Sequence, residues 1–206
     1  MNRLKLKAAE KSFLTRYPGG FSHPDMVTIS KKHKPEKMQS MAQEFFAPDQ
    51  FENSDTVIEH MIKVVSTSSM VSVFEKPKFR DVARGLGEDE KMGLSRGLYE
   101  FLHGDEETGF EIMVEILQLH KLAKWTLITV YGAYYNPERE VFVKPTTVKG
   151  IIKNFEIPDL IYKPIPTYDF YNKYRDVINE MKGLVDPALR PGNAAFSGFL
   201  MMSMED

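Results

Sequence analysis

The chain contains no cysteine and only one tryptophan among its 206 residues. Without a thiol it cannot form disulfide bonds, use a cysteine nucleophile, or bind zinc or an iron–sulfur cluster through cysteine. It also lacks a run of about 18 apolar residues, and its first segment, MNRLKLKAAEK, has no continuous apolar stretch of the kind found in secretory signals. The absence of both kinds of segment predicts a cytoplasmic protein that does not associate with a membrane, whereas the lack of cysteine says little about the compartment.

Sequence motifs for nucleotide and metal binding are absent as well. There is no G-x-x-x-x-G-K-[ST] and no H-E-x-x-H, and no two of the five histidines are four residues apart. The glycines in GLGEDEKMG have the wrong spacing for a dinucleotide fingerprint and lie among acidic residues that would repel a pyrophosphate. We therefore predict neither a metal site nor a cofactor.

The residues that are present have the balance of a folded globular protein, with 42% hydrophobic and 27% charged residues. A chain of 206 residues is long enough to bury one substantial core. We expect a single domain over 1–206, with an N-terminal helical subdomain over 1–68 as the alternative.

The charge of the chain is unevenly distributed. Residues 1–37 carry nine Lys or Arg against three Asp or Glu, whereas residues 88–115 carry nine acidic residues against two basic ones, and the whole chain has a net charge of −2. A basic segment in such a chain can bind nucleic acid, or it can dock on the acidic segment within the same fold. The sequence leaves both interpretations open.

Apolar residues recur at helical spacing over most of the chain. We predict helices over 3–16, 35–46, 78–85, 89–102, 105–122, 146–155 and 167–185, a further helix after Ser54 that includes Val57 to Val65, and a mainly loop-like segment over 21–35. The 105–122 helix is apolar around more than half of its circumference and leaves only a stripe containing Glu107, Glu111 and Glu115. This helix is expected to be central to the core.

The segment WTLITVYGAYYNPEREVFVKP predicts a β-hairpin. Its first part is rich in β-branched and aromatic residues, Pro137 suits a four-residue turn over 136–139, and residues 140–145 alternate. Because two strands alone are marginally stable, residues 71–74 or 160–162 are expected to extend the sheet. The predicted fold class is thus mainly α (α+β): a helical domain with one β-hairpin or small antiparallel sheet packed on the 105–122 helix.

Basic and aromatic residues suggest two binding surfaces, since lysines can contact phosphates and aromatic rings can stack on bases. The first is a basic N-terminal face, with candidate residues Arg3, Lys7, Lys11, Lys31 and Lys32. The second is the mixed face of the hairpin with the helix that follows it, with candidate residues Tyr131, Tyr135, Lys144, Lys149 and Lys153.

These features predict a non-enzymatic intracellular interaction module that binds nucleic acid or a protein partner. The alternative is an enzyme whose site is assembled from residues distant in sequence, for example a metal-dependent nuclease. A nuclease strand usually has an acid two residues before its lysine, whereas Glu140 and Lys144 are four residues apart. The sequence leaves the choice of partner and the oligomeric state open.

Overall fold

The computed structural model describes residues 1–204, and every regular element within them is helical. The α-helices are α1 (Arg3–Arg16), α2 (Pro24–His33), α3 (Pro35–Phe45), α4 (Ser54–Thr67), α5 (Glu75–Gly85), α6 (Glu88–His103), α7 (Glu106–Leu119), α8 (Trp125–Tyr135), α9 (Pro145–Asn154), α10 (Tyr168–Gly183) and α11 (Asn193–Met202). Short 3-10 helices cover Gly20–Ser22, Pro48–Phe51 and Pro187–Leu189. No helix in the described part of the chain is both long and apolar enough to cross a membrane.

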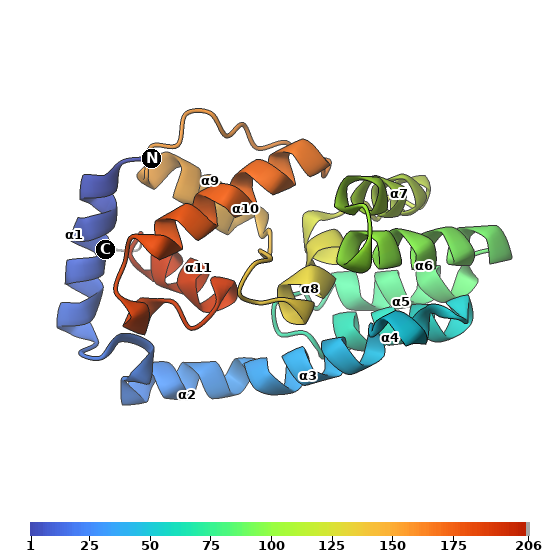
Figure 1. Ribbon diagram of the computed structural model, residues 1–206, viewed down its shortest axis with the longest axis horizontal. Coiled ribbons are helices and arrows are strands. Elements are labelled where there is room, and N and C mark those ends of the chain that lie inside the picture. Colours follow the sequence, from blue (N-terminus) through green and yellow to red (C-terminus); the bar gives the residue numbers. More distant parts are fainter. Residues whose placement is uncertain (205–206) are drawn as a thin grey trace.

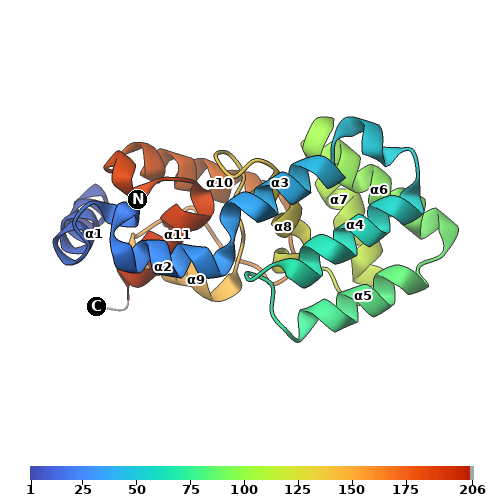
Figure 2. The same ribbon diagram turned by 90° about the horizontal axis from the view of Figure 1, so that it is seen from below.

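The helices form two groups (Figure 1). Helices α4 to α8 lie at one end of the molecule, while α1, α9, α10 and α11 lie at the other. Helices α2 and α3 run along one edge and connect the two ends, as the view from below also shows (Figure 2). The whole molecule is therefore elongated.

Helix α8 is the most deeply buried element. Residues 125–134 are all buried, and the helix carries no charged side chain. Thr129 satisfies its hydroxyl internally: it donates to the carbonyl of Trp125 at 2.7 Å and accepts from the amide of Val143 at 3.0 Å. A helix that is apolar on all sides is stable only when other elements surround it, and this is where α8 lies.

The predicted hairpin is wrong, and with it the α+β fold class and the small sheet. Residues 125–135 form α8, residues 140–144 are neither helix nor strand, and neither 71–74 nor 160–162 is a strand. The reason is that a short apolar run can be either a buried strand or a buried helix, and its periodicity does not distinguish the two. Surrounding helices bury every side of this segment, which outweighs the strand preference of its β-branched residues.

Helix α7 forms where the 105–122 helix was predicted, with Asp105 as its N-cap, and its acidic stripe is exposed. It is not the centre of the core, however, because α8 occupies that position. Helix α7 packs closely on α6, and a Cβ atom added at Gly109 would lie 2.2 Å from the amide nitrogen of Phe101 and 2.5 Å from the carbonyl oxygen of Gly97. Glycine is therefore required at this contact.

Several other predicted helices are confirmed. These helices begin or end at local capping signals that the sequence shows. Helix α1 covers residues 3–16 as expected, and Thr167 caps α10 by accepting from the amide of Phe170. The loop predicted over 21–35 is wrong: Pro24 is the first residue of α2, and the His23 side chain accepts from the amide of Asp25. Proline suits the first helical turn, so it starts this helix rather than preventing it.

Helix α1 packs on the C-terminal helices. The Phe13 ring contacts the Phe199 ring edge-on at 5.2 Å between centroids, and the amide of Asn2 donates to the carbonyl of Phe155 at 2.7 Å. Segments from the two ends of the described chain thus share one part of the core. The division into domains stays a prediction.

Candidate functional site

The basic row on α1 is largely neutralised within the molecule. Arg3 forms an ion pair with Glu180 at 3.3 Å, and Lys7 pairs with Glu10 at 2.6 Å. Lys11 is exposed and has no ion pair with any described residue. The acidic partners of Arg3 and Lys7 therefore do not come from the segment 88–115, which lies at the other end of the molecule (Figure 1).

The residues expected on the hairpin do not share a surface. Tyr131 is fully buried on α8, its hydroxyl has no hydrogen-bond partner among the described residues, and burial raises its pKa well above the usual value. Tyr135 is half-buried and its carbonyl accepts from the side chain of Gln43, whereas Lys144 is exposed at the N-cap of α9. On α9 itself, Lys153 is exposed and the Lys149 ammonium lies 5.0 Å from the centre of the Tyr162 ring.

Lysines also gather at the bend between α2 and α3. Lys34 ends α2 and precedes α3 in a left-handed conformation with φ of 48°, and Pro35 then starts α3. Lys31, Lys32 and Lys37 flank this bend, and all four lysines are exposed. None of the ion pairs formed by the described residues includes any of them.

The connection between α4 and α5 lies against this bend (Figure 2). The His33 ring nitrogen and the Ser69 hydroxyl are hydrogen-bonded at 2.8 Å and join the two segments. The connection then presents Phe74 with 78% of its surface exposed, next to exposed Val73. Lys76 and Lys78 follow at the start of α5 and are also without ion pairs among residues 1–204.

We call this region the junction surface, and its members are Lys31, Lys32, Lys34, Lys37, Val73, Phe74, Lys76 and Lys78. Its two segments contain six lysines against two glutamates, Glu36 and Glu75, on a chain whose net charge is −2. Ammonium groups without ion pairs can contact anionic groups, and an exposed aromatic ring can contact planar groups. Only Lys31 and Lys32 of this set were predicted, because the contact between residues 33 and 69 is not visible in the sequence.

A buried ionic network joins α7, α10 and the segment after α8. Arg175 donates from one nitrogen to both carboxylate oxygens of Glu140, at 2.9 and 3.0 Å, and from its other nitrogen to Glu106 at 2.9 Å. The Tyr171 hydroxyl donates to Glu140 at 2.5 Å, and Arg139 contacts both glutamates. Two positive and two negative side chains thus balance one another, with Glu140 and Arg175 buried, Glu106 partly buried and Arg139 exposed.

The pKa values of this network follow from its contacts. Burial by itself would lower the pKa of Arg175, but the charge of Glu140 and the hydrogen bond to Glu106 raise it above that of an ordinary arginine. For Glu106, burial acts to raise the pKa, and the bonds from Arg139 and Arg175 outweigh it and lower the pKa. Both groups are therefore charged in the folded protein at neutral pH.

This network bears on the nuclease-like alternative. The oxygens of Glu140 accept bonds from Arg175, Tyr171 and Arg139, and the side chain faces the interior instead of a solvent-exposed site. No group of three or more His, Cys, Asp or Glu suited to a metal ion occurs within residues 1–204. The sequence carries no clear signal for the network, because Arg139, Glu140 and Arg175 stand among other charged and polar residues.

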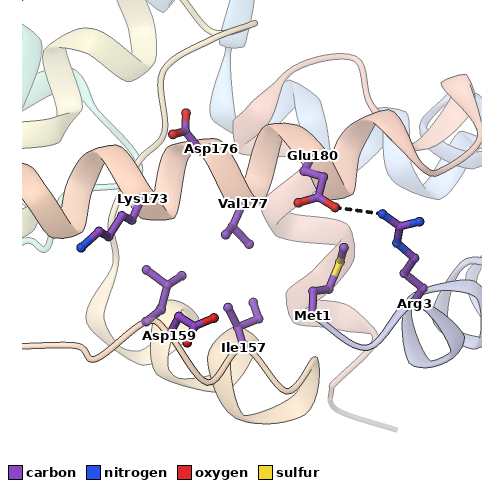
Figure 3. A pocket seen from close by; sticks show the side chains of 9 residues that line it. Met1, Arg3, Ile157, Asp159, Lys173, Asp176, Val177 and Glu180 are labelled. Carbon is purple, nitrogen blue, oxygen red and sulfur yellow. Dashed lines mark hydrogen bonds and ion pairs between the residues drawn. The ribbon is translucent and has the colours of Figure 1, made fainter.

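An open groove of about 550 Å³ follows one side of α10 (Figure 3). Its walls are α10, the start of α1 and the segment after α9, and its lining residues are Met1, Arg3, Ile157, Asp159, Leu160, Lys173, Asp176, Val177 and Glu180. The ion pair between Arg3 and Glu180 lies at one end of the groove, as the dashed line in Figure 3 shows. Sequence reasoning missed this groove, because it combines three distant segments.

Comparisons with protein-family models, with curated proteins and with solved structures each found no match to this chain.

Proposed function

We propose that this protein is a cytoplasmic nucleic-acid-binding module and that the junction surface is its binding site. The observation that supports the proposal is that the hydrogen bond between His33 and Ser69 joins two lysine-bearing segments without ion pairs, the second of which carries a largely exposed phenylalanine. Surface lysines are usually interspersed with acids, and a phenylalanine that is largely exposed contributes little to the core. A nucleic acid matches both kinds of group, because its phosphates can contact the lysines and its bases can stack on the ring.

Each part of the surface has a distinct task in this proposal. The lysines on α2 and α3 contact phosphates, which provides affinity without sequence preference. Phe74 provides a flat ring on which an unstacked base can lie, and such stacking contributes about 1 to 3 kcal/mol per base. Because a base in a duplex is already stacked, single strands should bind more tightly than double strands.

The proposal predicts a definite salt dependence. If about four lysines each contact one phosphate of a single strand, the logarithm of the association constant falls with the logarithm of salt concentration with a slope of about −3. The acidic exposed stripe belongs to α7, which lies across the molecule from the edge along which α2 and α3 run (Figure 1), so we expect salt to screen it from the lysines of that edge.

The test is fluorescence anisotropy with labelled oligo(dT) and a labelled duplex, over salt from about 0.05 to 0.2 M. The variant K31Q/K32Q/K34Q should bind oligo(dT) much more weakly and with a shallower salt slope. The matched control is K121Q/K124Q/K163Q, which removes three exposed lysines elsewhere and should retain most of the affinity.

A second variant tests the ring. The change F74A should weaken binding to oligo(dT) about fivefold or more and leave duplex binding nearly unchanged, because only a free base can stack. Absence of binding at the lowest salt, or equal losses in the junction and control variants, would contradict the proposal.

A further inference from the structure

The groove beside α10 has apolar lining residues and an uneven charge. Val177 and Ile157 point toward each other across the groove (Figure 3), and Leu160, Asp159 and Asp176 also line it. The two basic lining residues are already paired, Arg3 with Glu180 and Lys173 with Asp169. Neither aspartate forms an ion pair with any residue in the described part of the chain.

Two exposed apolar residues are sequence neighbours of the lining residues, although they do not line the groove themselves. Leu4, which directly follows Arg3, is 83% exposed, and Ile161, which directly follows Leu160, is 74% exposed. An apolar surface bordered by carboxylates without partners is suited to a segment that carries apolar and basic side chains together.

The same chain has a segment of this kind. Residues 73–78, VFEKPK, present Val73 and Phe74 to solvent, and Lys76 and Lys78 follow without ion pairs among the described residues. Phenylalanine and valine side chains are small compared with a groove of about 550 Å³. Apolar side chains would cover the apolar lining residues, and the lysines would face Asp159 and Asp176.

We propose that the groove beside α10 binds the 73–78 segment of a second copy of this chain. The two surfaces are different parts of the molecule, so the contact is heterologous, and each bound copy leaves one groove and one segment free. Association therefore continues from dimers to short chains instead of stopping at a symmetric dimer. The surfaces are small, so the association is weak and reversible, and it should strengthen at low salt.

This inference does not depend on the proposed function, but the two share Phe74, Lys76 and Lys78. A segment that lies in the groove of another copy cannot contact nucleic acid at the same time. Oligo(dT) should therefore dissociate the self-associated protein.

Sedimentation velocity over a range of protein concentrations at low salt tests the proposal. The wild-type protein should show a sedimentation coefficient that rises with concentration. The groove variant D159N/D176N and the segment variant F74A should each weaken self-association about tenfold, which corresponds to loss of two exposed ion pairs or of one buried ring. The control variant E107Q/E111Q removes two exposed carboxylates from α7 and should associate like the wild type.

A mixing experiment makes the test specific. The F74A protein retains its groove and the D159N/D176N protein retains its segment, so an equimolar mixture should form one-to-one dimers that do not extend further. Lack of concentration dependence in the wild type, an equal loss in the α7 control, or failure of the mixture to associate would overturn the inference. The groove variant should still bind oligo(dT), so failure here is distinct from failure of the nucleic-acid proposal.

Discussion

The buried pair between Glu140 and Arg175 offers the sharpest test of how the two groups of helices are held together. Side-chain exposure is 6% for Glu140 and 5% for Arg175, and the guanidinium contacts both carboxylate oxygens. Replacing Glu140 with Gln preserves the shape but leaves a buried cation with only Glu106 as a charged partner. Breaking a buried pair in this way costs about 3 to 5 kcal/mol of unfolding free energy.

The reverse change, R175M, leaves the Glu140 carboxylate buried but still in contact with Arg139 and Tyr171. We therefore expect R175M to cost less than E140Q. In the double variant E140Q/R175M no unpaired charge of this pair remains, so its cost should be smaller than the sum of the two single costs by about 2 to 3 kcal/mol. That difference is the coupling energy of the pair.

The assay is urea unfolding followed by circular dichroism, for the wild type, both single variants and the double variant. The matched control is the exposed pair between Asp169 and Lys173 on the same helix, for which D169N and K173M should show coupling below about 1 kcal/mol. Raising sodium chloride from about 0.1 to 1 M should abolish the control coupling and leave the buried coupling nearly unchanged. A cost for E140Q below about 1 kcal/mol, or coupling no larger than that of the control, would refute the reasoning.

Two further results follow from individual side chains. The pKa of Glu106 is lower in the folded protein than in the unfolded chain. Its stabilising contribution is therefore present above the unfolded pKa of about 4.3 and is lost as the pH falls through the folded pKa. Urea midpoints measured below about pH 5 should fall more steeply for the wild type than for E106Q. The change Y131F removes a buried hydroxyl that has no hydrogen-bond partner among the described residues. The unfolding free energy should therefore stay the same or rise by about 1 kcal/mol, and the affinity for oligo(dT) should not change. A loss of affinity would show that Tyr131 contributes to binding.

The sequence by itself determined the elements whose signals are local. Helix α1 ends where Tyr17 precedes Pro18, and α10 begins where Thr167 caps it, because caps and helix-breaking residues act within a few positions of one another. The exposed acidic stripe of α7 was equally predictable, since helical spacing alone places its glutamates on one face.

The tertiary structure decided everything that depends on residues far apart in the chain. The segment 125–135 is helical because neighbouring helices cover all its sides, and a local preference for strand cannot report that burial. Glu140 contacts Arg175 across 35 positions, and the hydrogen bond between His33 and Ser69 joins the basic bend to the connection that carries Phe74. Such contacts result from the packing of whole helices, so the network, the groove and the junction surface become visible only when the chain is folded.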